Sequence, residues 1–221
     1  MDQLGPQDLL IGFISYFVFL FSTTCHEAAH AFVAKLGGDN TAALGGQVTL
    51  NPIPHIRRSP FGMVVVPLIG ILLGNGMILG WASAPYDPLW ERRHPRRSAW
   101  MALAGPATNF TLMLLAAVAI HIARSMQLFN VDPFHRSVDV LGAVLSTLFY
   151  LNLLLGTFNL LPVPPLDGST AIMIFMNENQ SQRYLDWIRG SSYAMAGLLV
   201  GMLVFYRIFP AIALFARQIL L

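Results

Sequence analysis

Five long apolar segments divide this chain, and short polar connections separate them. The segments cover residues 8–35, 61–83, 99–122, 138–161 and 191–216. An apolar run of about 20 residues is long enough to cross a bilayer as an α-helix. The runs lack the regular ten-residue alternation that builds a transmembrane β-barrel. The pattern therefore predicts an all-α membrane protein, folded as a polytopic helical bundle.

The second segment differs from the others because helix breakers interrupt it. Pro67 and Gly70 lie inside it, and Gly74-Asn75-Gly76 stands near its middle. If this segment crosses the membrane, the thirteen lysines and arginines divide six inside and seven outside. If it enters and returns, nine lie inside and four outside. Cytoplasmic loops carry an excess of Lys and Arg, so we expect about four full spans plus a re-entrant or broken segment at 61–83.

The connection before this segment contains a turn and a short alternating stretch. Gly45-Gly46 is typical of a turn, and Gln47–Leu50 alternates apolar and polar residues. This pattern predicts a short β-hairpin-like loop beside the helices. No other stretch is long enough for a second folded unit, so residues 1–221 are expected to form a single domain.

Composition supports the membrane assignment and excludes some functions. Hydrophobic residues make up 55% of the 221 residues, charged residues 11%, and the mean hydropathy is +0.60. Soluble domains carry about 25% charged residues. The net charge is +2, with no basic patch interleaved with aromatics, which argues against nucleic acid as a partner. Cys25 is the single cysteine, so no internal disulfide and no cysteine metal cluster can form.

The first apolar segment carries a motif that lipid alone does not explain. His26-Glu27-Ala28-Ala29-His30 is an HExxH sequence near the end of this segment. Residues i and i+4 share one helix face, so both imidazoles can bind one metal ion while Glu27 reaches a nearby water. Ionisable groups at membrane depth are costly and are functional candidates by default. The motif therefore predicts a zinc site with a carboxylate base.

A catalytic zinc needs a third protein ligand, and Asp167 is the best placed candidate. It follows a helix end that Pro162, Pro164 and Pro165 break, and Gly168 would let the backbone turn beside it. If residues 61–83 re-enter, Asp167 lies at the same side of the membrane as the histidine pair. The alternative is that Asp167 only caps the helix that follows it.

Three motifs in this order resemble the site-2 protease family of intramembrane zinc metalloproteases. They are HExxH at 26–30, AGPATNF at 104–110 and FNLLPVPPLDG at 158–168. The resemblance implies one zinc ion bound by His26, His30 and Asp167, with Glu27 as general base. It also implies that Asn159 steadies the substrate or the oxyanion, whereas an asparagine in a span can equally serve an interhelical hydrogen bond.

The expected function is hydrolysis of peptide bonds within or near transmembrane segments of membrane-protein substrates. Two alternatives stay open: a catalytically silent zinc-binding chaperone or adaptor, and a metal transporter using the same ligands. The expected partners are a transmembrane protein or peptide and the lipid bilayer, and the sequence does not specify an oligomeric state. The expected location is a prokaryotic plasma membrane, which the protein crosses several times, and the charge pattern predicts that the active site lies towards the cytoplasm.

Overall fold

Four long helices dominate the computed structural model, which describes residues 5–73, 80–129, 139–190 and 194–220. They are α1 (Pro6–Leu36), α6 (Pro95–Ser125), α7 (Val140–Asn159) and α10 (Ala194–Arg217). Within the described residues, four helices are long and apolar enough to cross a membrane, one from each of these elements. The prediction of an all-α polytopic bundle with four full spans is confirmed.

The helix ends follow from local sequence signals. Pro6 occupies the first turn of α1, where its missing N–H is not needed, and the helix ends at Gly37 before Gly38 with φ +97°. Asp139 caps α7 by accepting a hydrogen bond from the Gly142 amide. The chain leaves α7 just before Pro162, which cannot continue a helix.

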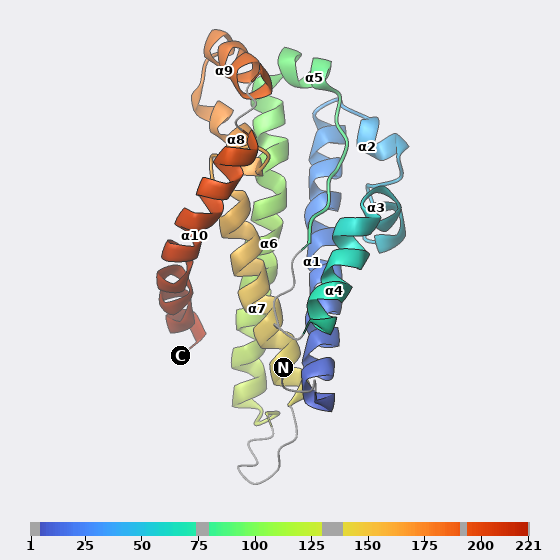
Figure 1. Cartoon of the computed structure of the whole chain (residues 1–221), viewed down its shortest axis with the longest axis vertical. Helices are drawn as coiled ribbons and strands as arrows, with labels where there is room; N and C mark the ends of the chain where they lie inside the picture. Colours follow the sequence, from blue (N-terminus) through green and yellow to red (C-terminus); the bar gives the residue numbers. More distant parts are fainter. Residues whose placement is uncertain (1–4, 74–79, 130–138, 191–193, 221) are drawn as a thin grey trace.

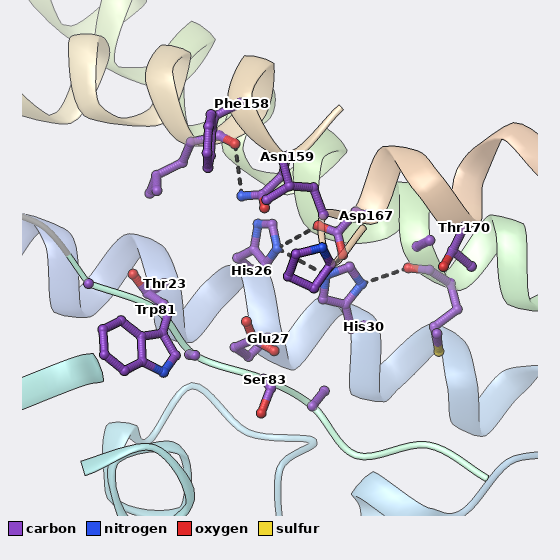
Figure 2. A pocket seen from close by; sticks show the side chains of 18 of the residues that line it. Thr23, His26, Glu27, His30, Trp81, Ser83, Phe158, Asn159, Asp167 and Thr170 are labelled. Carbon is purple, nitrogen blue, oxygen red and sulfur yellow. Dashed lines mark hydrogen bonds and ion pairs between the residues drawn. The ribbon is translucent and has the colours of Figure 1, made fainter. Parts of the chain in front are cut away.

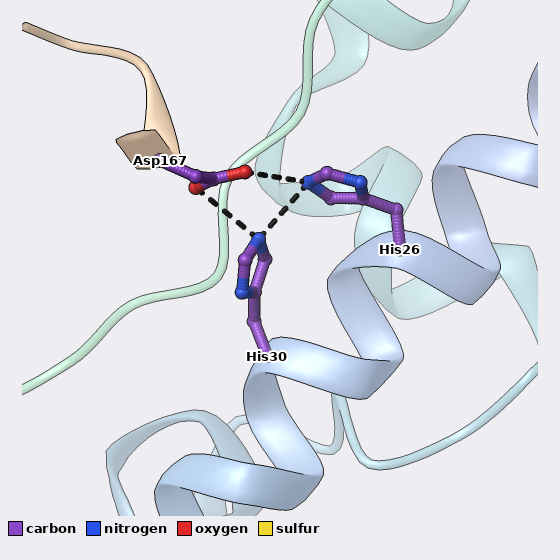
Figure 3. Close-up of side chains that lie close together, drawn as sticks. All are labelled: His26, His30 and Asp167. Carbon is purple, nitrogen blue, oxygen red and sulfur yellow. Dashed lines mark hydrogen bonds and ion pairs between the residues drawn. The ribbon is translucent and has the colours of Figure 1, made fainter. Parts of the chain in front are cut away.

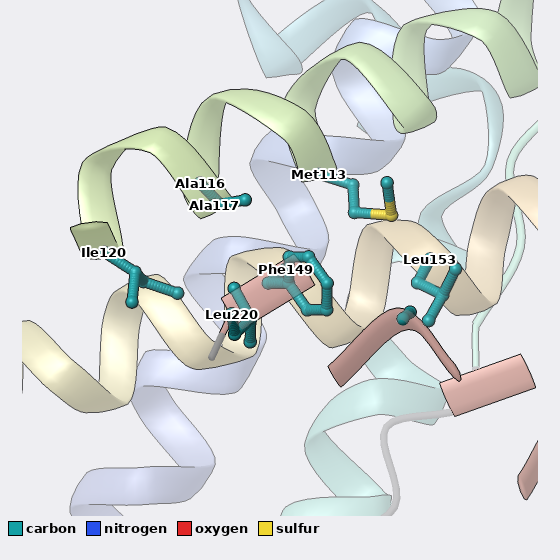
Figure 4. Packing of buried hydrophobic residues seen from close by; sticks show 8 residues of the cluster. Met113, Ala116, Ala117, Ile120, Phe149, Leu153 and Leu220 are labelled. Atoms are coloured by element: carbon teal, nitrogen blue, oxygen red, sulfur yellow. The ribbon is translucent and has the colours of Figure 1, made fainter. Parts of the chain in front are cut away.

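Helix α6 is the centre of the bundle and packs against both α1 and α7, while α10 leans against α7 from outside (Figure 1). A buried apolar cluster joins α6, α7 and the end of the chain (Figure 4). Its members are Met113, Ala116, Ala117, Ile120, Phe149, Leu153, Ala216 and Leu220. The small side chains of Ala116 and Ala117 on α6 belong to the same cluster as the large side chains of Phe149 and Leu153 on α7. This combination lets the two helices approach closely and hold their relative position.

The interrupted second segment folds back on itself. A π-helix, η1 (Phe61–Val65), continues into α4 (Val66–Leu72), and residues 80–87 then return as extended chain. The Trp81 amide donates to the Gly62 carbonyl at 3.2 Å, so the returning chain lies beside the start of the segment. The segment thus returns towards the end from which it started, as its charge pattern predicts. Gly74-Asn75-Gly76 lies outside the described residues.

Short helices gather at one end of the bundle, the end at which α1 finishes (Figure 1). They are α2 (Thr41–Leu44), α3 (Pro52–Arg58), α5 (Pro88–Arg93), α8 (Asp167–Ala171), η2 (Ile172–Phe175) and α9 (Glu178–Gly190). A last short helix, η3 (Gln218–Leu220), lies instead against the C-terminal part of α6. This arrangement places the HExxH end of α1 and the start of α8 at the same end of the molecule.

The predicted β-hairpin-like loop is wrong. Val48–Leu50 form bends, Gln47 has no regular secondary structure, and the described residues contain no β-strand. The Gln47 amide closes the turn after α2 by donating to Ala42 O, and the Thr49 hydroxyl accepts from the Asn51 amide before α3. These local bonds hold the stretch in turns at both of its ends, an arrangement that alternation alone does not predict.

Candidate metal centre

Three side chains from two distant parts of the chain converge near the C-terminal end of α1. His26 Nε2 lies 3.1 Å from Asp167 Oδ2, and His30 Nε2 lies 3.3 Å from Asp167 Oδ1 (Figure 3). The two Nε2 atoms are 2.9 Å apart. Among the described residues, this is the group of His, Cys, Asp and Glu whose ligand atoms lie close enough to hold one ion.

A backbone carbonyl fixes the tautomer of His30. Its Nδ1 lies 2.7 Å from Met101 O on α6, and a carbonyl oxygen can only accept a hydrogen bond. His30 Nδ1 therefore carries the proton, and in the neutral ring Nε2 presents a lone pair towards Asp167.

Two buried asparagines fix the tautomer of His26 in the same way. Asn152 Nδ2 donates to Leu148 O at 2.8 Å, so Asn152 Oδ1 is the acceptor for Asn109 Nδ2, also at 2.8 Å. Asn109 Oδ1 must then accept from His26 Nδ1 at 2.6 Å. His26 Nε2 is left with a lone pair, like that of His30.

The arrangement is suited to a cation. Two imidazole lone pairs and a carboxylate face one point, and without a positive charge between them three acceptors at these distances would repel one another. A Cβ on Gly105 of α6 would lie 2.4 Å from His30 Nε2 and 2.5 Å from His26 Nε2. Only a glycine lets α6 pass this close to both imidazoles. The donor set of two nitrogens and one oxygen fits zinc and leaves a coordination position open.

Asp167 reaches the histidines from the chain that follows α7. It is the first residue of α8, one position after the N-cap Leu166, and its carboxylate contacts both histidines. Asp167 therefore does not occupy the N-cap position, and its role as the third ligand stays a prediction. Gly168 lies inside α8 and does not form the expected turn. A Cβ at this position would lie 2.2 Å from Leu160 O, so glycine is needed for close backbone packing.

Glu27 lies beside the three converging side chains and is nearly buried, with 5% of its surface exposed. Its Oε2 has no hydrogen-bond partner among the described residues. The carboxylate points into a cavity of about 290 Å³ that Asp167 and both histidines also line. Figure 2 shows the Glu27 side chain between the two imidazoles and the extended 80–87 segment. A buried carboxylate without a partner is costly unless a water or an ion meets it.

Asn159 lines the same cavity at the last residue of α7. Its Nδ2 donates to Leu155 O of its own helix at 3.0 Å (Figure 2). The side chain makes no interhelical hydrogen bond to the described residues, so the structural alternative for Asn159 finds no support. Its amide group lies beside Asp167 in the cavity lining (Figure 2).

Comparison with known proteins gives a consistent result. Residues 128–204 match Peptidase family M50. The chain is 34% identical over 150 residues to "Putative zinc metalloprotease YwhC" of Bacillus subtilis, covering 67% of this chain and 63% of that protein. It is 35% identical over 153 residues to "Putative zinc metalloprotease Rip2" of Mycobacterium tuberculosis, covering 69% and 53%. The chain belongs to the site-2 protease family, peptidase family M50.

The chain spans about half to two thirds of the length of these relatives. No solved structure matches it significantly. The names of the site-2 protease relatives agree with zinc as the ion that the geometry favours.

Sequence reasoning missed two parts of this site-2 protease centre. The role of Asn109 is one: its amide joins α6 to Asn152 of α7 and also holds His26 of the centre. Asn152 itself was overlooked, although an amide in an apolar span is a signal in its own right. The cavity wall formed by residues 80–84 and Tyr86 was also missed, because nothing in its sequence marks it as extended.

Proposed function

We propose that this protein is a zinc metalloprotease that hydrolyses peptide bonds within or near transmembrane segments of membrane-protein substrates. In this proposal His26, His30 and Asp167 hold one zinc ion, and Glu27 is the general base. The observation that carries it is the convergence of two fixed imidazole lone pairs and a carboxylate beside an unpartnered buried glutamate.

Each polar group in the cavity has a role in this chemistry. Zinc, when bound, acidifies water and polarises a carbonyl oxygen. Glu27 takes a proton from the attacking water and delivers it to the departing amine. Asn159 Nδ2 donates to the oxygen that becomes negative as water adds to the carbonyl carbon. Both side chains line the cavity, so they can act on one bound peptide bond.

The substrate must present its carbonyl in an unwound form, because a helix engages its carbonyls in i to i−4 bonds. The extended 80–87 segment, which lines the cavity, is the surface that receives it. The backbone groups of Ala82 and Ala84 make no hydrogen bond to the described residues. An unwound substrate can pair with this edge as an added strand that crosses the cavity.

The orientation in the membrane follows from the distribution of charge. Nine of the thirteen lysines and arginines lie on segments at or near the end of the bundle that carries the metal centre. By the positive-inside tendency this end faces the cytoplasm of a prokaryotic plasma membrane.

Glu27 distinguishes the protease from the two alternatives. A zinc-storing adaptor or a metal transporter needs ligands, but it does not need a buried carboxylate that is left without a partner beside them. Transport sites also lie between repeated halves, and the sequence shows no internal repeat.

The test is quantitative proteomics of membranes from cells carrying the wild-type protein or Glu27→Gln. We expect a small set of single-span proteins to accumulate uncut in the variant, and purified wild-type protein to cleave them in liposomes. Identical membrane proteomes, together with zinc movement across liposomes by the purified protein, would favour the transporter instead.

A further inference from the structure

The extended 80–87 segment is held at three points on the side away from the cavity. The Trp81 amide donates to Gly62 O, as described above. Ser83 O accepts from Arg58 Nε at 3.0 Å, and the Asp87 amide donates to Asp39 Oδ2 at 2.8 Å. The backbone groups between these points stay unpaired among the described residues. The segment is therefore anchored at Trp81, Ser83 and Asp87, and the backbone groups between these anchors are available for pairing.

The Asp39 anchor is a buried carboxylate with 4% of its surface exposed. Its Oδ1 accepts from the amide and the hydroxyl of Thr41, at 2.9 and 2.5 Å, and its Oδ2 accepts from Asp87 alone. Burial raises the pKa of Asp39, but the hydrogen bonds from Thr41 and Asp87 outweigh it and lower the pKa below its usual range. Each oxygen thus has a separate task, one in the local turn and one on the extended segment.

The anchors tie the segment to the helix that carries the metal centre. Asp39 follows the last residue of α1 by three positions. The carbonyl of Gly37, the C-cap of α1, accepts from Trp90 Nε1 at 3.0 Å and from Arg97 Nη1 at 3.1 Å. Arg58, at the end of α3, holds the other part of the segment. The distance between the 80–87 edge and Glu27 is set through these bonds.

We propose that Asp39 and Arg58 are positioning residues for substrate binding: they hold the 80–87 edge where an unwound substrate strand can pair with it beside Glu27. This inference rests on the proposed function. Neither residue lines the cavity, so both act through the backbone of the extended segment.

Arg58 offers the cleaner test because its neighbour is a matched control. Arg57 and Arg58 are both exposed, and among the described residues Arg57 donates no hydrogen bond. Arg58→Met removes the bond to Ser83 O, while Arg57→Met removes the same charge one residue away. We expect Arg58→Met to raise KM for a single-span substrate in liposomes about fivefold with kcat unchanged, the factor for one typical hydrogen bond. Arg57→Met should leave both constants unchanged.

Asp39 is tested with Asp39→Asn against Thr41→Val. Asparagine keeps an oxygen for Thr41 but turns an NH₂ group towards the Asp87 amide, whereas valine removes only the hydroxyl bond within the turn. We expect Asp39→Asn to raise KM by a similar factor and to speed hydrogen exchange across residues 80–87. Thr41→Val should change neither, and both variants should retain zinc.

The outcomes separate this inference from the proposed function. If the wild-type protein cleaves the substrate and each variant matches its control in KM and in exchange at 80–87, the positioning role is wrong and the protease proposal stands. If Asp39→Asn does not fold, the comparison of Arg58→Met with Arg57→Met, in KM and in hydrogen exchange at residues 80–87, still decides whether the positioning role holds. A wild-type protein that cleaves no membrane substrate would overturn the proposed function itself.

Discussion

At the scale of single residues, the metal centre depends on hydrogen-bond acceptors that belong to residues other than its three ligands. Met101 O accepts directly from His30 Nδ1, and Leu148 O acts on His26 through Asn152 and Asn109, so these two carbonyls determine which nitrogen of each histidine has a free lone pair. His26, Glu27 and His30 could be named from the sequence because polar groups in an apolar segment need a reason, and Asp167 because it follows a proline-broken helix end and matches a family motif. The orienting acceptors could not, since a backbone carbonyl leaves no mark in a sequence.

Asp167→Asn tests the third ligand. A neutral amide oxygen is a weaker donor to zinc than a carboxylate, so zinc content after dialysis and turnover of a helical substrate should fall together. Asparagine caps helices about as well as aspartate, so capping predicts a nearly silent change. Full zinc content with wild-type turnover would remove Asp167 from the ligand set.

Asn109→Ala tests the orienting chain. Loss of a residue that orients a metal ligand typically lowers metal affinity about 10–100-fold, and we expect a decrease in that range in competition with a chelator. Thr108→Val is the control, since its hydroxyl bonds only to Ala104 O in its own helix. Equal zinc affinity in the two variants would mean that His26 keeps its orientation without Asn109.

At the scale of elements, the period and length of the apolar segments were enough to locate the long helices. The limits of α1, α6, α7 and α10 lie within a few residues of the predicted segments. The secondary-structure predictions were wrong where a short segment could satisfy its backbone hydrogen bonds in more than one way. Gln47–Leu50 closes turns, although its alternation favours a strand. Residues 80–87 are extended, although they continue an apolar run that favours a helix.

Gly105→Ala tests the contact between α6 and the imidazoles of α1. The added methyl group would overlap both Nε2 atoms, so we expect loss of zinc and activity while the spans still form. Gly201→Ala in α10 is a fair control, because its Cβ would meet Val163 at 3.6 Å, an ordinary contact distance. Unchanged zinc binding in Gly105→Ala would show that the imidazoles lie elsewhere.

At the scale of the whole molecule, the returning 61–83 segment makes the centre possible. If this segment crossed the membrane, His30 and Asp167 would lie at opposite faces. Its return brings the end of α1 and the start of α8 to one end of the bundle (Figure 1). The charge distribution predicted this return. The short distances among His26, Glu27, His30 and Asp167 depend on helix packing, which only the folded chain shows.

Cysteine labelling tests this topology. In a Cys25→Ala background, Arg57→Cys and Arg96→Cys should react with a membrane-impermeant reagent only from the cytoplasmic side, and Leu128→Cys only from the other side. All three positions are exposed. Labelling of positions 57 and 96 from opposite sides would mean that 61–83 crosses the membrane, and the centre could not then assemble as described.

The most direct test of the central claim is Glu27→Gln in purified protein, with zinc content and turnover of a single-span substrate measured on the same sample. The change removes the base and spares His26, His30 and Asp167. The account predicts one zinc per chain in both proteins and at least about a hundredfold loss of turnover, within the range of general-base contributions. Near wild-type turnover in Glu27→Gln would contradict it.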